Sequence, residues 1–533
     1  AGDVHHQSGR SPEIHRLLGY ECRTEHRRDD ARVKGLEDWQ ALPSGVACGR
    51  KNIKLKILRK NREHALGFLF AEFHTILKNM NRHKTGASPT IEFFGGVGEV
   101  TGSCYVVSFE DTKILIDCGM FQGSEAMDVM NRKDFQFDAA SIDAVFITHA
   151  HIDHIGRLPK LIKSGFHGAI YSTLPTKELS ELLLADSLHF MKDPDEALYN
   201  EDDIKKTVSL WKSLEYHQEI QVGSFSVSLR DAGHILGSSM IHIKAGEKQI
   251  LFSGDFGNSP SILLPPPEEM PDGIEYLVIE STYGNRVHDV SEDRALKLER
   301  AIEDVVTNGG VLMIPAFATE RTQDILYKLN EMVMHSRIPK IPIFVDSPLA
   351  IKATAVFNKF RNHYNADVQE AMRKDPEIFN FKGLKFTSTV DESKAINDVP
   401  PPKVILAGSG MSTGGRILHH ELRYLPDPRS MLLLVGYQSG GSLGRRLSDG
   451  ASEVKILKEM VAVRAEIRKV AGFSAHADGP QLFNFVKRGR ASLKRVFVVQ
   501  GENEAAAALA QEIKDQLGVT AETPSLYEKV VLE

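Results

Sequence analysis

The sequence predicts an α/β protein that contains a parallel sheet. From Ser88 onward the chain shows short β-rich segments that are separated by glycine turns. From about Arg294 to Val435, strand-like and helix-like segments alternate one by one, and a final strand–helix pair follows near the C-terminus. Such alternation is typical of helices that connect parallel strands. The 533 residues correspond to roughly three domains at ~150 residues each.

Alternating or continuous apolar runs predict the strands of the first half of the chain, and apolar spacings of three and four predict its helices. Strands are expected at 90–94, 103–109, 113–117, 144–148, 225–230, 240–245, 249–253 and 276–280. Helices are expected at 155–163, 177–188 and 201–213.

The second half continues with a helix from about residue 294. Strands are then expected at 310–315, 342–345, 404–407, 432–435 and 495–499, and helices at 322–335, 351–363 and 504–517.

Composition excludes several classes of protein. Hydrophobic residues make up 42% and charged residues 26% of the chain, which is ordinary globular usage and not that of a disordered, collagen-like or coiled-coil protein. The four cysteines, Cys22, Cys48, Cys104 and Cys118, form neither a CxxC pair nor a dense framework, which favours a reducing cytosol. No apolar run approaches ~18 residues and no leader pattern begins the chain. We therefore expect a cytoplasmic protein with no membrane partner.

Residues 1–88 differ in charge from the rest of the chain. They hold 17 Lys/Arg and 10 Asp/Glu, a balance of +7, so the remaining residues carry −13. The pattern indicates a basic strand or amphipathic segment at 51–60 and a helix at 63–80. The segment is either an extension that grips RNA or a solvated tail, and the tail is favoured because charge runs are usually solvated. A polyanion site elsewhere would have to be a local patch around metals or arginines.

The most informative stretch is THAHIDH, which follows the apolar strand AVFI directly. It places His149, His151, Asp153 and His154 in one loop. Imidazole and carboxylate ligands together suit zinc or a similar borderline metal. A surface histidine cluster is the alternative for this loop taken alone.

Three later loops have the same character. His234 stands in DAGHILGSS, Asp255 ends the apolar strand of LFSGDFG, and His476 stands in GFSAHAD. Each alone is more often a structural residue, but together the four loops offer seven ligands. That number suffices for two open metal sites completed by solvent.

These motifs, in this order and spacing, resemble the metallo-β-lactamase superfamily, and GFSAHAD narrows the resemblance to its β-CASP nucleic-acid-processing branch. IESTYGNR, IPAFATERTQDIL, VDSPLA and AGSGMSTGGR support the match. The chain is most similar to exonuclease-type RNA-processing members related to the cleavage-and-polyadenylation endonuclease subunit. The resemblance covers about Pro89 to Leu532.

The resemblance implies a four-layer αβ/βα domain with an inserted α/β domain. The expected boundaries are an N-terminal extension at 1–88, the first part of the metallo-β-lactamase domain at 89–285, the β-CASP domain at 286–446, and at 447–533 the last part of the metallo-β-lactamase domain with its RNA-metabolising motif.

The resemblance also implies the roles of the ligands. His149, His151 and His234 would hold one zinc ion; Asp153, His154 and His476 would hold a second. Asp255 would bridge the two ions. A hydroxide shared by the ions would attack phosphorus, with Asp153 able to accept a proton. Glu280 is the family's candidate acid behind the ligands and, with Asp153 and Asp255, completes the catalytic set.

Candidate phosphate contacts lie outside the metal loops. The Gly-rich turn at 408–416 offers backbone N–H groups and side chains for an anion, namely Ser409, Gly410, Ser412 and Arg416. Arg321 is expected at the cleft between the domains.

The chain departs from the family at two positions. Arg446 stands where relatives often have a histidine that protonates the leaving group. An arginine does not give up a proton near neutral pH, so we expect Arg446 to hold a phosphate. His419 and His420 are possible substitutes for the acid. Gln500, in QGE where relatives often have HGE, puts one substrate-side contact in doubt.

The predicted function is a zinc-dependent ribonuclease that hydrolyses single-stranded RNA with two ions per chain. A DNA-acting nuclease of the same branch and a small-molecule hydrolase remain alternatives. The sequence leaves open endo- or exonucleolytic mode, polarity, natural RNAs, the metal used in vivo and the oligomeric state, for which a homodimer is one possibility.

Overall fold

The computed structural model describes residues 88–533, except 124, 192–196 and 289–290. The predicted strand at 51–60 and helix at 63–80, and the whole question of the extension, lie outside the described residues. So do Cys22 and Cys48.

The first sheet has seven strands in the order β22-β1-β2-β3-β4-β5-β6. β22, β1, β2 and β3 pair in antiparallel fashion, and β3 to β6 are parallel. Its strands are β1 Thr90–Gly95, β2 Cys104–Phe109, β3 Thr112–Ile116, β4 Ala144–Phe146, β5 Ala169–Ser172, β6 Trp211–Ser213 and β22 Lys529–Val531.

The second sheet also has seven strands, in the order β21-β20-β11-β10-β9-β8-β7. β10, β11, β20 and β21 are parallel, and β7 to β10 form an antiparallel meander. Its strands are β7 Ile220–Val222, β8 Phe225–Asp231, β9 Ser239–Ala245, β10 Lys248–Phe252, β11 Tyr276–Glu280, β20 Arg495–Val499 and β21 Thr520–Glu522.

The two sheets pack face to face. Since successive side chains of a strand point to opposite faces, a strand can contribute to two cores. In β2, Tyr105 and Val107 join the apolar core between the sheets, whereas Cys104 and Val106 join a second core under the outer helices. Those helices are α2 Glu125–Arg132, α3 Ile152–Ile155, α4 Leu158–Lys163, α5 Leu174–Phe190 and α6 Glu201–Ser209.

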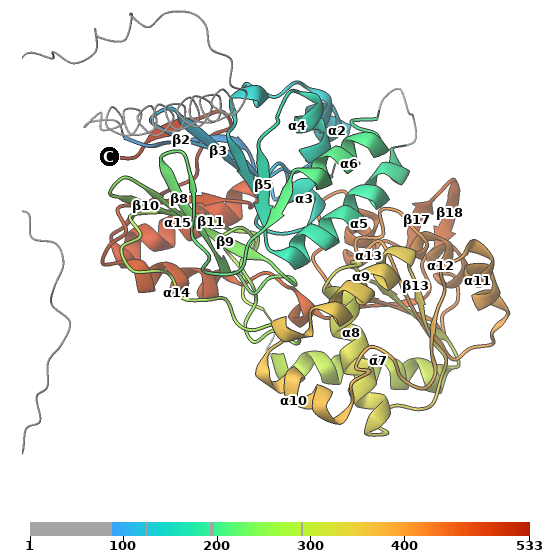
Figure 1. The fold of residues 1–533 in the computed structure, drawn as a ribbon. Coiled ribbons are helices and arrows are strands. Elements are labelled where there is room, and N and C mark those ends of the chain that lie inside the picture. Colours follow the sequence, from blue (N-terminus) through green and yellow to red (C-terminus); the bar gives the residue numbers. More distant parts are fainter. Residues whose placement is uncertain (1–87, 124, 192–196, 289–290) are drawn as a thin grey trace, which may run out of the picture. The chain divides into compact units, whose positions relative to one another are not determined.

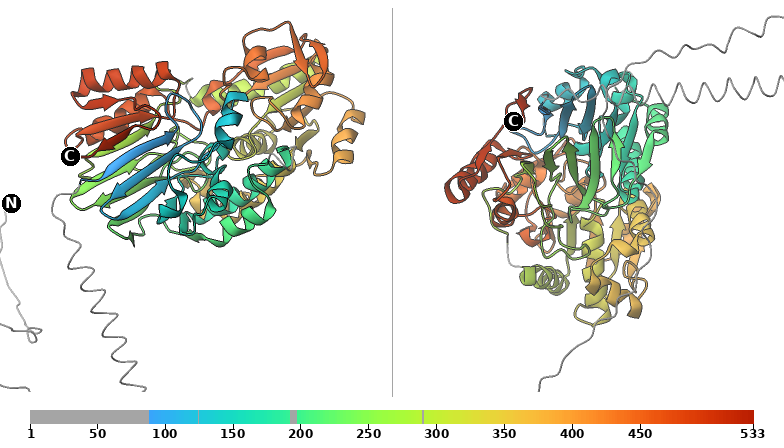
Figure 2. Two further views of the ribbon diagram at one scale, coloured as in Figure 1. Left: turned by 90° about the horizontal axis from the view of Figure 1, so that it is seen from above. Right: turned by 60° about the vertical axis from the view of Figure 1, so that its left-hand side comes forward.

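The outer face of the second sheet is covered by α14 Gly479–Gly489 and α15 Asn503–Leu517, whose apolar residues pack on β11 and β20. The left view of Figure 2 shows the red C-terminal helices on one side of the strands and the teal helices on the other. The four-layer arrangement predicted from the sequence is therefore confirmed.

A third sheet lies within the chain between β11 and β20. Its six strands are all parallel, in the order β14-β13-β15-β12-β16-β19. They are β12 Val311–Pro315, β13 Ile343–Asp346, β14 Leu384–Phe386, β15 Lys403–Ala407, β16 Met431–Leu434 and β19 Glu466–Lys469. The doubly wound texture predicted between Arg294 and Val435 is this sheet (Figure 1).

Helices flank this sheet on both faces: α7 Ser291–Asn308, α8 Arg321–Met334, α9 Pro348–Lys359, α10 Ala366–Lys374, α11 Val390–Ala395, α12 Ile417–Tyr424 and α13 Leu443–Ser448. A separate hairpin, β17 Glu453–Ile456 and β18 Glu459–Ala462, precedes β19. β19 pairs with β16, so the third sheet also includes residues 466–469.

Two local expectations differ from the structure. The helix expected at 201–213 begins after the capping box of Asn200 but ends at Ser209. It ends there because residues 211–213 pair with β5 as strand β6. The helix expected at 155–163 is two short helices, α3 and α4. None of the helices in the described part of the chain is long and apolar enough to cross a bilayer.

Candidate metal centre

The predicted ligands meet at one end of the two stacked sheets, most of them in loops that follow strands, whereas Asp153 and His154 lie in the short helix α3. His149 and His151 follow β4, and His151 is the N-cap of α3. His234 lies between β8 and β9, and Asp255 follows β10. The loop of His476 pairs with the loop of Asp255 through a β-bridge between His476 and Gly257 and through the backbone hydrogen bonds beside it. The fold thus brings together residues that are up to about 330 positions apart in the sequence.

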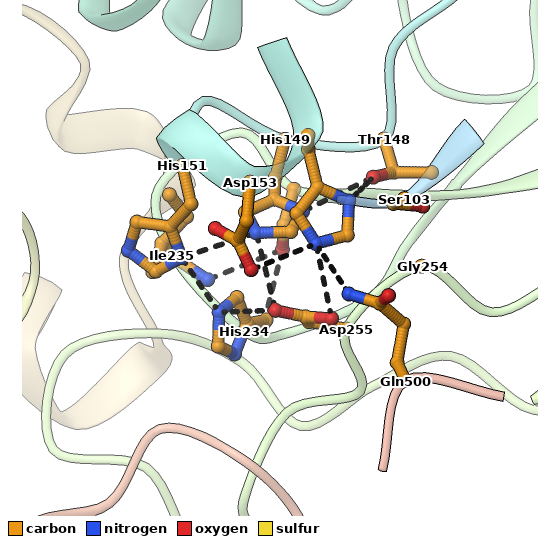
Figure 3. A network of polar contacts seen from close by, with 12 residues as sticks. Ser103, Thr148, His149, His151, Asp153, His234, Ile235, Gly254, Asp255 and Gln500 are labelled. Atoms are coloured by element: carbon orange, nitrogen blue, oxygen red, sulfur yellow. Dashed lines mark hydrogen bonds and ion pairs between the residues drawn. The ribbon is translucent and has the colours of Figure 1, made fainter. Parts of the chain in front are cut away.

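One set of ligand atoms comes from His149, His151, His234 and Asp255, all within 4.8 Å of one another. Nδ1 of His151 lies 3.1 Å from Nε2 of His149 and 3.3 Å from Nε2 of His234. Oδ2 of Asp255 is 3.3 Å from Nε2 of His149. Donors around a tetrahedral zinc ion at ~2.0–2.1 Å stand roughly 3.3–3.4 Å apart. The spacing of these four side chains therefore fits zinc, and Figure 3 shows them pointing toward one another.

A second set, Asp153, His154 and His476, also lies around Asp255: Asp153 and His154 form one group with it, and His476 forms another with it and Glu280. Nε2 of His154 lies 3.3 Å from Oδ1 of Asp255 and 3.7 Å from Oδ2 of Asp153. Nε2 of His476 lies 3.9 Å from Oδ2 of Asp255. Oδ1 of Asp255 is buried with no hydrogen-bond partner among the described residues, and a buried carboxylate oxygen of this kind calls for a cation. Asp255 is therefore placed to serve both sets.

Burial keeps the three histidines of the first set neutral. It lowers the pKa of His149 to about 4, an effect that His154 reinforces, and it lowers the pKa of His151 and His234 well below the ordinary value of 6.5. Neutral imidazole is the form that binds a metal.

The second set instead attracts positive charge. Burial would lower the pKa of His154 and His476, but nearby carboxylates overcome it: Asp255 and Asp117 raise the pKa of His154 well above 6.5, and Glu280 and Asp255 raise that of His476 to about 9. Burial raises the pKa of Asp255, yet His154 and His149 hold it well below its usual range. The surplus of carboxylates on this side suits a divalent cation.

Two carboxylates orient the histidines of the second set. Oδ2 of Asp117 lies 2.7 Å from Nδ1 of His154, and both carboxylate oxygens of Glu280 lie 3.1 Å from Nδ1 of His476. Each contact leaves Nε2 of the ring aimed at the centre. Carboxylates behind ligating histidines fix the tautomer and raise ligand basicity. Glu280 thus lies where the resemblance places it, whereas Asp117 is an additional residue.

Asp117 and Thr148 were not singled out in the sequence. Asp117 ends an apolar strand, as Asp255 does, and this was the available signal. It accepts hydrogen bonds from the backbone N–H of Thr148 at 2.8 Å and from the hydroxyl of Ser103 at 3.1 Å. The hydroxyl of Thr148 lies 2.9 Å from Oδ2 of Asp117 and 3.1 Å from Nδ1 of His149. Thr148 therefore connects the two sets.

Gln500 lies at the centre as well. Its Nε2 is 3.2 Å from Nε2 of His154, and its Oε1 is buried without a partner among the described residues (Figure 3). The resemblance to the family predicts a substrate contact at this position. The structure places it against a predicted metal ligand.

The residues predicted to contact phosphate lie on the third sheet or near it. The turn with Ser409 and Gly410 follows β15, and its Ser412 donates from its hydroxyl to Glu421. Arg416 donates to Oδ1 of Asp346 at 2.7 Å and to the carbonyl of Thr387 at 3.0 Å. These bonds hold the guanidinium of Arg416 within the inserted domain. A phosphate would have to compete with them, so the contact of Arg416 with a phosphate stays a prediction.

Arg446 is exposed, and no ion pair of its guanidinium is found among the described residues, whereas the neighbouring Arg445 pairs with Asp449 at 2.9 Å. His420 is buried and held at 2.7 Å by Asp346, while His419 on the same helix is exposed. The two histidines therefore point to different surroundings, as expected for neighbours on a helix.

Arg321 lies at the junction of the two domains, as predicted. A small polar pocket there is lined by His234, Arg294, Glu320, Arg321 and Asp324 among others. Arg321 pairs with Asp324 at 3.3 Å. Oε2 of Glu320 accepts the backbone N–H of Leu236, two residues after the ligand His234, at 3.1 Å. The inserted domain thus contacts a metal loop directly.

Comparisons with known proteins agree with this geometry. Residues 97–301 match the metallo-β-lactamase superfamily, residues 322–447 the β-CASP domain, and residues 460–524 a domain described as the Zn-dependent metallo-hydrolase RNA specificity domain.

Relatives cover most of the chain. Ribonuclease TTHA0252 of Thermus thermophilus is 37% identical over 418 residues, which are 78% of this chain and 94% of that protein. Transcription termination factor FttA of Methanosarcina mazei is 31% identical over 90% of this chain and 77% of its own length. A crystal structure of a protein of unknown function from Enterococcus faecalis shares the fold, with a TM-score of 0.50 and 14% identity over 84% of this chain and all of that one.

Proposed function

Because the chain belongs to the β-CASP branch of the metallo-β-lactamase superfamily, we propose that it hydrolyses phosphodiester bonds of single-stranded RNA at a centre for two zinc ions. Membership makes it a zinc-dependent, RNA-specific metallo-hydrolase. The strand state of the RNA, the number of ions and the residue roles are the proposal.

The observation that carries the proposal is the position of Asp255. Its Oδ2 lies 3.3 Å from His149 of the first set, and its Oδ1 lies 3.3 Å from His154 of the second. Oδ1 has no hydrogen-bond partner among the described residues. His149, His151 and His234 would hold one ion, and Asp153, His154 and His476 the other, with Asp255 shared. Bound zinc would supply a Lewis acid that neutralises the phosphodiester and makes water more acidic.

The chain's own residues complete the chemistry. Asp117 and Glu280 hold the rings of His154 and His476 in the orientation that presents Nε2. The side chain of Asp153 is 18% exposed, and burial raises its pKa to about 6, so it is placed to accept a proton from the attacking water. Arg446 and the turn at 408–416 lie on the inserted domain, where they would contact the phosphates of a longer substrate.

The test compares one labelled 30-nucleotide sequence as single-stranded RNA, as an RNA duplex and as single-stranded DNA. The protein is stripped with a chelator and reloaded with measured amounts of zinc. Cleavage of single-stranded RNA should rise until about two ions are bound per chain and should exceed cleavage of the duplex. Faster cleavage of DNA, or saturation at one ion, would refute the proposal. Products of 5′- and 3′-labelled RNA then distinguish internal from terminal cleavage.

A further inference from the structure

Phe317 is an exposed aromatic residue at the carboxyl end of the third sheet. It follows β12 by two residues, and 38% of its surface is exposed. β12 lies between β15 and β16, and all three strands are parallel. The residues that follow them, Phe317, the turn beginning at Gly408, and Gly436, therefore meet at one edge of the sheet.

The ring of Phe317 lies against backbone that carries no side chain. A Cβ atom at Gly410 would come within 2.7 Å of Cδ2 of Phe317, and one at Gly436 would lie 3.7 Å from Cε2. Gln438 holds these two backbones in place, since its Nε2 donates to the carbonyls of Gly410 at 3.0 Å and Gly436 at 3.2 Å. The sheet thus supports an aromatic ring on a fixed bed and leaves part of it open to solvent.

Two chains of contacts lead from this ring to the metal centre. Tyr437, next to Gly436, lies 5.6 Å from Tyr283 between ring centroids, and Tyr283 lies 6.3 Å from the ring of His476. On the other side, Glu320 follows Phe317 by three residues and accepts the backbone N–H of Leu236 in the His234 loop. The loops that surround the exposed ring are therefore connected to the loops of both His476 and His234.

We propose that Phe317 is a stacking platform for one nucleobase of the RNA strand whose phosphodiester lies at the metal centre. This inference rests on the proposed function. An exposed phenyl ring offers a π-face that every base can cover, and stacking does not depend on base identity. A flat apolar ring beside hydroxyl-bearing Ser409 and Thr413 would contact a base while the turn contacts the backbone.

The experiment measures steady-state hydrolysis and zinc-free binding of a single-stranded oligouridylate by the full chain. Stacking of one base on an aromatic side chain corresponds to roughly 5- to 150-fold in affinity. Phe317→Ala should therefore raise KM and the dissociation constant by that factor, with kcat within about threefold of the parent. Phe317→Trp should keep the KM and dissociation constant of the parent, because tryptophan also offers an aromatic face for stacking.

Phe386→Ala is the matched control. Phe386 is 37% exposed and lies on the edge strand β14, three strands from β12 or roughly 14 Å across the sheet. It should leave KM unchanged.

A scan of abasic sites supplies the decisive comparison. Removing the base that covers Phe317 should weaken binding to the parent by the same factor as Phe317→Ala, and should cost Phe317→Ala almost nothing more. If Phe317→Ala matches the parent, or if no abasic position loses its effect in that variant, stacking is wrong while ribonuclease activity stands. If the zinc-loaded parent cleaves no RNA, the proposed function fails first.

Discussion

Replacing Asp117 by Asn tests whether the carboxylate behind His154 tunes the metal centre. Asp117 is 1% exposed and accepts hydrogen bonds from Ser103, Thr148 and His154, the last at 2.7 Å. Asparagine keeps the shape but removes the charge, and its NH2 group faces donors. Whichever oxygen the NH2 group replaces, it then faces another N–H donor, either that of the Thr148 backbone or that of the His154 ring.

The expected loss of zinc affinity follows from the contact between Asp117 and the predicted ligand His154. Removing a partner behind a ligating histidine typically weakens metal binding ~10- to 100-fold, or about 1.4–2.7 kcal/mol. The loss should fall mainly on the ion held by His154, because the ring of His149 contacts Asp117 only through the hydroxyl of Thr148. Folding should be weakened as well, by about 1.5–3 kcal/mol for the lost charged hydrogen bond.

The assay is zinc competition against a chromophoric chelator, which resolves the affinities of the two ions, with thermal unfolding of the metal-free protein beside it. Asp111→Asn is the control, since Asp111 is exposed in the turn after β2 and changes the same charge. If Asp117→Asn binds both ions as tightly as Asp111→Asn, the carboxylate serves only the protein core and the reasoning is wrong.

Three further predictions concern the ligands, the substrate and a buried acid. Asp255→Ala should lose at least one zinc by elemental analysis and all hydrolysis; two retained ions with full activity would contradict the shared role of Asp255. Arg446→Ala should lower kcat/KM roughly 10- to 150-fold and flatten the salt dependence of RNA binding. Arg446→Lys should keep part of the activity. Arg445→Ala should resemble the parent, because the guanidinium of Arg445 already pairs with Asp449. Equal values for both alanine variants would make Arg446 structural. Burial raises the pKa of Glu421 to about 8, so its stabilising effect is present below its ordinary value near 4.5 and is lost as the pH rises through 8. Glu421→Gln should therefore gain stability relative to the parent between pH 5 and pH 8, by at most ~1.4 kcal/mol per pH unit, and a difference in unfolding free energy that stays constant over this range would refute this.

Sequence patterns predicted the elements whose signal is local. Apolar strands such as β11, which is wholly buried, and β10, whose last three residues are buried, were predicted within a residue or two of their bounds. The loops that leave such strands carry the ligands, so strand and ligand are read from the same short stretch.

The missed strands lack this signal because they lie at sheet edges. β19 (EIRK) has no buried residue, and β22 (KVV) has one. Both are defined by partners far away in the chain, β16 and β1, which no local pattern reveals.

Side-chain partners were harder to predict than ligands. Arg416 was assigned from its glycine-rich turn, but the acid that holds it, Asp346, stands 70 residues earlier in VDSPLA. Gln500 reaches His154 across 346 residues. A motif shows which groups are present, whereas competition between possible partners is decided only when distant strands come together.

The inserted domain forms hydrogen bonds with residues next to the predicted metal ligands. Glu320 accepts a backbone N–H two residues from the ligand His234, and Tyr437 donates from its hydroxyl to Glu502 at 2.7 Å, two residues from Gln500. Each set of ligands therefore has a neighbour that is bonded to the inserted domain. A motion that separates the domains to admit or release an RNA strand would break both bonds. Because interactions next to the ligands would be lost in such a motion, it would also change the surroundings of the ligands. A hydrolase for small molecules would have no use for such a motion, since its substrate needs no second domain to bind along.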